Sequence, residues 1–282
     1  MAGNFWNSSH CEQWLLAKQD LLRERGVDLK YLTEDEYQRV MVFYVDFIQA
    51  LGEQWQKNMR QQVISTSIVY FKRFYSTNSL KSIDPLLLAP TCLMLAVKVE
   101  EYGVQPHTKL FAACTQLLKN RFSGAFSCSE YPYRNAHVAE AEFYLLETMD
   151  CCLIVFHPYR PIRHFVEDIA AAGGHAANLD DLKQLACKIC NDSFKTDVCL
   201  LFPPHVIALA CVHMAAVSLK RDLSNWLAEL ATDLTVVVDV ERAILAYYQL
   251  PKSHEHIAAL LDKVPKASSA PGGGGGGALY SA

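Results

Sequence analysis

Two almost uncharged stretches, 119 residues apart, constrain the fold of this chain more than any other feature. Residues 86–97 carry no charged side chain, and residues 204–219 carry none besides two histidines. In both places an amphipathic stretch leads through a short loop and a proline into the uncharged segment. Small residues recur at matching positions: Ala89, Cys92 and Ala96 correspond to Ala208, Cys211 and Ala215. The spacing predicts two similar helical domains, each built around a central buried helix that its neighbours approach closely.

The rest of the chain also follows a helical period, and no convincing period of two indicates a strand. Thr33-Glu-Asp-Glu36 has the pattern of a capping box, and Asp84-Pro85 places an N-cap before a first-turn proline. We therefore expect an all-α protein. The predicted helices cover about residues 9–25, 33–53, 57–76, 84–99, 107–120, 133–150, 179–196, 204–219, 224–231, 233–249 and 254–262, with one more starting near residue 158.

Composition and charge exclude several classes of protein. The chain has 282 residues and a formal net charge of −4, which disfavours a nucleic-acid or membrane surface that needs a cationic face. The uncharged run of residues 86–97 is too short to span a bilayer, which takes about 20 residues. No basic segment followed by an apolar core opens the sequence, so we expect no secretory signal and reduced cysteines. No catalytic motif set is recognisable.

Several segments resemble the cyclin family. TSIVYFKRFY (66–75) and SIDPLLLAPTCLMLAVKVEE (82–101) are similar to the first cyclin box, and AEFYLLETMDCCL (141–153) to the last helix of that box. Within the family, NFWNSSHCEQW, DLKYLTEDEY and FHPYRP resemble the C-type cyclins. The resemblance implies two tandem five-helix repeats preceded by an N-terminal helix. The expected divisions are residues 1–33 for the N-terminal helix and linker, 34–153 for the first box, 154–250 for the second, and 251–282 for a short helix and a disordered Gly/Ser/Ala tail.

The same resemblance implies a regulatory role without an active site. C-type cyclins activate the cyclin-dependent kinase of the Mediator kinase module, which also contains Mediator subunits 12 and 13 and regulates transcription by RNA polymerase II in the nucleus. On this reading the chain needs no cofactor and contacts neither nucleic acid nor membrane directly.

Four charged residues are candidates for the kinase contact. Lys98 ends the uncharged run, where it could also simply compensate a helix dipole. Glu142 lies on or beside the apolar stripe of its helix, where a carboxylate is costly unless it is paired or exposed. In cyclins the matching lysine and acid together grip the kinase. Glu100 and Glu101 are either solvated loop charges or partners for kinase arginines.

The N-terminal segment is rich in aromatic residues: Phe5, Trp6 and Trp14. Tryptophan is enriched at interaction hot spots. The alternative is that the segment folds back on the body and that Trp6 fills a groove between the domains. The resemblance to C-type cyclins implies that this region helps to select the kinase and lies near a groove linked to Mediator subunit 12.

Two competing classes remain open at this point. The duplicated cyclin-like repeats of transcription factor IIB bind promoter DNA, but such a role needs a basic stripe that is not evident here. Cys187-Lys-Ile-Cys190 could belong to a zinc site, although no second pair at matching spacing accompanies it. On a helix the two thiols share a face, as buried structural cysteines do.

Overall fold

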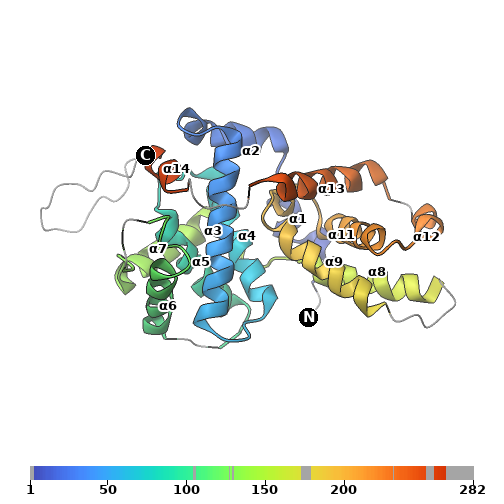
Figure 1. The fold of residues 1–282 in the computed structure, drawn as a ribbon, viewed down its shortest axis with the longest axis horizontal. Helices are drawn as coiled ribbons and strands as arrows, with labels where there is room; N and C mark the ends of the chain where they lie inside the picture. The colour runs from blue at the N-terminus through green and yellow to red at the C-terminus, as the bar shows by residue number, and fades with distance from the viewer. Residues whose placement is uncertain are drawn as a thin grey trace, which may run out of the picture.

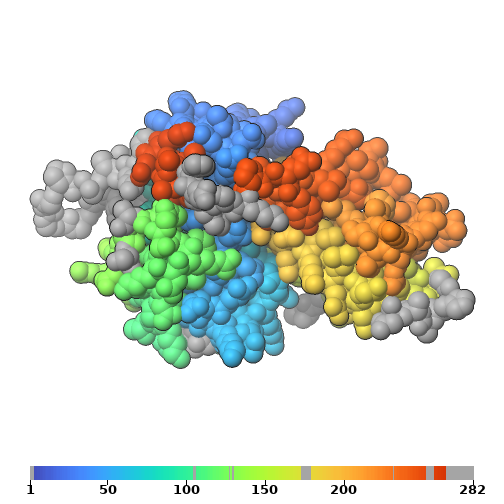
Figure 2. Space-filling view, viewed as in Figure 1, coloured from blue at the N-terminus to red at the C-terminus, as the bar shows by residue number. Residues whose placement is uncertain are grey.

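The chain folds into two helical lobes that lie side by side, as the computed structural model shows (Figures 1 and 2). The structure describes residues 3–103, 106–126, 128, 130–172, 179–230, 232–251 and 257–264. Within those ranges every regular element is a helix, which confirms the predicted all-α class. None of the described helices is long and apolar enough to cross a membrane.

The first lobe packs around one central helix. It consists of α3 (Glu34–Trp55), α4 (Gln61–Thr77), α5 (Pro85–Val99), α6 (His107–Lys119) and α7 (Asn135–Thr148). Helix α5 contacts α3, α4 and α7, and its side chains from Leu88 to Val97 are all buried. The uncharged run of the sequence is therefore the core of this lobe, because a helix surrounded on all sides has no face for charged side chains.

The second lobe repeats this arrangement around α11 (Pro204–Ser218). Helix α11 contacts α8 (Tyr159–Ala172), α9 (Asp180–Ser193) and α13 (Leu234–Gln249). The short helices α10 (Val198–Leu201) and α12 (Ser224–Glu229) complete the lobe. Helices α4 and α9 begin 119 residues apart, and so do α5 and α11, so the predicted repeat is confirmed.

The two central helices also end alike. Glu101 follows α5 with φ +50°, and Lys220 follows α11 with φ +55°. In each case the next amide closes the helix by donating to a carbonyl five residues earlier: Tyr102 to Val97, and Arg221 to Ala216. This is the left-handed helix end that usually contains glycine. The repeat therefore extends to backbone geometry that a search for identical residues does not detect.

The prediction of one continuous helix over residues 9–25 is wrong. The segment forms η1 (Phe5–Asn7), α1 (Ser9–Glu12), α2 (Lys18–Glu24) and η2 (Arg25–Lys30). Between α1 and α2 the Leu16 amide donates to the Leu200 carbonyl of the second lobe at 2.8 Å. Trp14 is buried, with the Arg73 guanidinium 4.9 Å from its ring centroid. These tertiary contacts outweigh the local helical pattern of residues 13–17.

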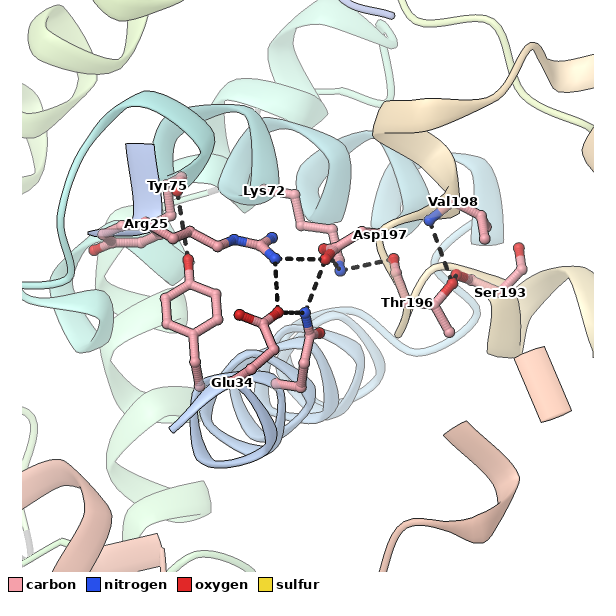
Figure 3. Close-up of polar contacts among 10 residues, drawn as sticks. Arg25, Glu34, Lys72, Tyr75, Ser193, Thr196, Asp197 and Val198 are labelled. Carbon is pink, nitrogen blue, oxygen red and sulfur yellow. Dashed lines mark hydrogen bonds and ion pairs between the residues drawn. The ribbon is translucent and has the colours of Figure 1, made fainter. Parts of the chain in front are cut away.

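A buried charge cluster joins the N-terminal segment to both lobes (Figure 3). Arg25 of η2 donates to Asp197 at 2.7 Å, Gln38 of α3 donates to the same carboxylate at 2.9 Å, and Lys72 of α4 lies 3.4 Å from it. Lys72 also donates to the Thr196 carbonyl at 2.8 Å. Burial alone would raise the pKa of Asp197, but Lys72 and Arg25 outweigh it and hold that pKa well below its usual range.

The chain returns to the first lobe after the second. Helix α14 (Ile257–Lys263) packs against α3, and Lys263 pairs with Glu36 at 2.5 Å. The short helix expected before the tail is therefore present. Residues 265–282, expected to be disordered, lie outside the described residues.

Candidate functional site

The C-terminal end of α5 brings Lys98 to the surface of the first lobe. Asp84 caps the start of the helix by accepting from the Leu86 amide at 2.8 Å, and Pro85 occupies its first turn. The cap and the proline fix the first residue of α5. The packing of its apolar side chains then fixes the point at which the helix reaches the surface. Lys98 is the first charged residue after the buried run, and its side chain is 53% exposed.

Lys98 and Glu142 form the ion pair that the sequence suggested. The ammonium group lies 2.5 Å from one carboxylate oxygen of Glu142 and 2.8 Å from the other. Glu142 projects from α7, where Val138, Ala141 and Leu145 bury the adjacent face. The Glu142 side chain is only 16% exposed, so Lys98 forms the exposed end of the pair. The pair leaves two opposite charges at the junction of α5 and α7, where a partner's polar groups can reach them.

Glu100 is held by α4 rather than left as a solvated loop charge. One oxygen accepts from Thr66 at 2.6 Å and the other from Gln62 at 2.7 Å. Thr66 also lies 2.7 Å from Nε2 of His157. A hydroxyl has a single proton, and the carboxylate can only accept, so Nε2 of His157 must donate to Thr66. Glu101 is exposed and adopts the left-handed conformation described above.

His157 suits this arrangement because it stays neutral. Its burial, followed by the nearby charge of Arg73, lowers the pKa of His157 to about 3. A neutral imidazole that donates through Nε2 leaves Nδ1 without a proton, and Nδ1 is buried with no hydrogen-bond partner. His157, in the segment between the two lobes, thus orients Glu100 through Thr66. No sequence motif predicted this connection.

Two exposed apolar side chains in the first lobe were also missed. Phe143 follows Glu142 on α7 and is 74% exposed, and Ile154, beyond the end of that helix, is 67% exposed. The signal for Phe143 was present in the sequence: it is a large aromatic side chain outside the apolar stripe of its helix. Exposed apolar side chains of this size are typical of an interaction surface.

The N-terminal aromatic residues occupy different environments. Trp6 is 59% exposed and lies 5.2 Å from the ring of His205, at the start of α11. Phe5 packs edge-on against Phe156 at 5.6 Å. Both line a cavity of about 460 Å³ with His157, Tyr159 and His205. Trp14 does not join them, because its ring is buried in the core.

The possible zinc site finds no support in the geometry. Cys190 is buried in α9 and Cys187 is partly exposed. Among the residues that the structure describes, no three or more histidine, cysteine, aspartate or glutamate side chains gather as metal ligands. Burial raises the pKa of Cys190 well above its usual range, so this thiol is a poor thiolate ligand.

Comparison with known proteins places both lobes in one family. Residues 21–154 match the family model for the cyclin N-terminal domain, and residues 157–264 match that for the cyclin C-terminal domain. The chain belongs to the cyclin family. Cyclins are regulatory subunits of kinase complexes, so this chain is a regulatory and not a catalytic subunit.

The similarity to C-type cyclins is close along nearly the whole chain. Cyclin-C of Drosophila melanogaster is 52% identical over 275 residues, which cover 96% of this chain and 99% of that protein. Cyclin-C of Rattus norvegicus is 51% identical over 274 residues, covering 96% and 93%. The resemblance inferred from the sequence segments is thereby confirmed.

Solved structures of more distant proteins share the fold. A chain of the CAK complex of Chaetomium thermophilum superposes with a TM-score of 0.71 at 20% identity, covering 92% of this chain and 87% of that one. A chain of the yeast TFIIK (Kin28/Ccl1/Tfb3) complex gives 0.61 at 24% identity, covering 85% and 100%. The two-lobed arrangement therefore persists at low sequence identity.

Proposed function

We propose that this chain binds and activates the cyclin-dependent kinase of the Mediator kinase module, and so regulates transcription by RNA polymerase II in the nucleus. The similarity to Cyclin-C proteins over 96% of the chain supports this proposal. The observation that carries the docking site is the half-exposed Lys98 paired with Glu142 at the junction of α5 and α7. Mediator subunits 12 and 13 are the further proposed partners, and neither nucleic acid nor a membrane is among them.

Lys98 and Glu142 are suited to gripping main-chain groups of a partner helix. The ammonium group has three donors on a flexible stem, and the carboxylate accepts. Each restrains the other before the kinase arrives, which lowers the entropy lost on binding. Phe143 and Ile154 add the apolar contact area that a charged pair lacks.

Glu100 and Glu101 contribute charge beside this pair. Because Thr66 and Gln62 fix Glu100, its carboxylate offers a kinase arginine a preorganised acceptor. Such pairs raise association rate and specificity more than affinity. We infer that activation is a population shift: the chain binds the kinase conformation with its catalytic lysine–glutamate pair in place more tightly than the inactive one.

The N-terminal segment is proposed as a second contact region, with different roles for its aromatic residues. Phe5 and Trp6 border the cavity and can touch a partner directly. Trp14 is buried under Arg73, so we limit its role to holding the segment in place.

The test measures activity of the partner kinase with wild-type chain, Lys98→Glu, Glu142→Lys and the double variant. Each single variant places two like charges side by side, so kinase binding and activation are expected to fall by about tenfold or more. Lys119→Glu is the matched control, because Lys119 is equally exposed on α6 of the same lobe. Unchanged kinase activity with both single variants would rule out this docking site.

A further inference from the structure

The second lobe has an exposed apolar face that the proposed kinase site does not use. Helix α13 buries Val237, Val240 and Ile244 against the core. The flank of the helix next to this buried side also carries large apolar side chains at helical spacing: Leu234 (44% exposed), Val238 (39%), Leu245 (50%) and Tyr248 (37%). The apolar stripe of this helix is therefore wider than the part that the core buries, and its exposed part is available to a second partner. Helix α13 lies at the surface of the second lobe (Figure 2), and all four side chains stay at least 37% exposed, although the Tyr248 hydroxyl donates to Asp192 of α9 at 3.1 Å.

Helix α11 contributes to the same face. His213 of α11 contacts Glu241 of α13 at 2.6 Å, which places the two helices side by side at this point. One turn beyond His213 lies Val217, which is 61% exposed. Large apolar side chains on two adjacent helices form a contiguous surface, and such patches mark interaction sites. We call Val217, Val238, Glu241, Leu245 and Tyr248 the α11/α13 face.

The internal repeat relates the α11/α13 face to the proposed kinase site of the first lobe. The shift of 119 residues places Val217 at the position of Lys98, and α13 aligns on α7 so that Glu241 takes the position of Glu142. The buried residues Val237, Val240 and Ile244 then match Val138, Ala141 and Leu145. The α11/α13 face is thus the second-lobe counterpart of the proposed kinase site, with the acid retained and the lysine replaced by valine.

The retained acid indicates the charge of the partner. Glu241 is only 15% exposed and sits between Val238 and Leu245 along the apolar side. In the first lobe the chain itself supplies the lysine that faces the acid. In the second lobe valine takes the place of that lysine, and among the described residues the base beside Glu241 is His213, which is weaker than lysine. A partner cation at this point would take the place of the missing lysine and keep the carboxylate paired as it is buried.

We propose that the α11/α13 face binds an amphipathic helix of another protein, with a lysine or arginine at the centre of its apolar stripe. From Leu234 to Tyr248 the apolar side extends about 21 Å, at about 1.5 Å per residue, which matches a partner helix of about four turns. A groove between two helices accepts a third by the usual packing of ridges into grooves.

A second copy of this chain fits the face poorly. A symmetric dimer built on it would bring two Glu241 side chains toward each other across the axis. Like charges brought together during burial are costly. The partner is therefore a helix of different sequence that carries the opposite charge.

The test uses the full chain and two synthetic helical peptides of about four turns. Both carry leucine at the stripe positions, and they differ in a central lysine or glutamate. Fluorescence anisotropy is expected to show saturable binding of the lysine peptide and at least about tenfold weaker binding of the glutamate peptide. Leu245→Asp and Glu241→Gln are each expected to weaken the lysine peptide by a similar factor.

Val27→Asp is the control variant, since Val27 is equally exposed (48%) but lies in η2, outside the face. It should bind the lysine peptide as the wild type does. Equal binding of the two peptides, no binding of the lysine peptide, or binding that Leu245→Asp leaves unchanged would each overturn the proposal. A dimer in sedimentation that Leu245→Asp dissolves would also overturn it, because the occupant would then be a second copy. Kinase activation tests the Lys98–Glu142 site separately.

Discussion

The two lobes share a backbone and differ in the side chains that their central helices bring to the surface. In its last turn α5 carries Lys98, paired with Glu142, whereas the last turn of α11 carries Val217, one turn after the His213 that contacts Glu241. Both helices close on a left-handed residue, Glu101 or Lys220. A duplicated fold can therefore keep its architecture while each copy of one face acquires its own chemistry. Function follows the exposed positions, because the buried ones are constrained by packing.

The loops after the central helices show the same divergence. In the first lobe Glu100 accepts from Thr66 and Gln62 of α4. In the second, Leu185 and Asp181 occupy the corresponding positions on α9, and Asp181 pairs instead with Arg221 at 2.7 Å. Each loop is tied to the same neighbouring helix, but the carboxylate has moved from the loop to the helix. The position of Glu100, proposed above to face the kinase, is thus occupied by Leu219 in the second lobe.

The largest effect on stability is expected at a position that is neutral in the first lobe and charged in the second. Asp197 occupies the second-lobe position that Asn78 holds in the first. Asp197→Asn makes the two positions identical, removes the carboxylate that faces the buried Lys72, and leaves Arg25 with the longer contact to Glu34 at 3.4 Å. The free energy of unfolding should fall by about 3–5 kcal/mol, measured by denaturant titration. Asp20→Asn, which removes an exposed pair with Arg23, should change it by no more than about 1 kcal/mol.

Comparing the wild type with Asp197→Asn at several pH values tests the pKa of Asp197. Because this pKa is lowered in the folded state, the stabilisation is fully present above the unfolded-state value of about 3.9 and is lost as the pH falls through the folded-state value. The difference in unfolding free energy between wild type and Asp197→Asn should thus be constant near neutral pH. It should narrow only in acid; a difference that already halves between pH 7 and 5 would contradict the assignment.

A smaller effect is expected from the link that positions Glu100. Thr66→Val removes the hydroxyl between His157 and Glu100 and leaves buried polar groups unpaired. Unfolding free energy should fall by about 1–3 kcal/mol, and kinase activation should weaken as well. Thr91→Val is a matched control, since Thr91 is also buried but bonds only its own helix, at the Leu87 carbonyl. If both variants activate the kinase equally, Glu100 needs no positioning.

The smallest effect on stability is expected for glycine at the two left-handed helix ends. These variants distinguish the role of the backbone conformation from that of the Glu101 side chain. Glu101→Gly and Lys220→Gly each relieve a left-handed residue, which costs about 1–2 kcal/mol, and each adds the chain entropy of glycine, about 0.5–1 kcal/mol. Both variants should therefore be stabilised by up to about 1.5 kcal/mol, measured as a change in Tm. Kinase activation should drop with Glu101→Gly alone. An equal drop with Lys220→Gly would show that the Glu101 side chain is not the cause.

Sequence patterns predicted the helices that are buried along their whole length and the helix starts that depend on neighbouring residues. The uncharged runs identified α5 and α11 because a fully buried helix excludes charge on every side. The capping box at Thr33 and the Asp84-Pro85 start are both present in the structure. The break between α1 and α2 was missed, since it depends on the bond from Leu16 to Leu200, residues far apart in the chain.

The sequence by itself determined the helical repeat, the family and the charged residues at the end of α5, because these follow from local periodicity and from matches in order along the chain. The resemblance to cyclins already implied that Lys98 pairs with Glu142. Only the tertiary structure tied Glu100 to His157 through Thr66, buried Trp14 while leaving Trp6 exposed, and set Glu241 within an apolar face. Such contacts depend on how helices pack, and packing is fixed by the whole core and not by any one segment.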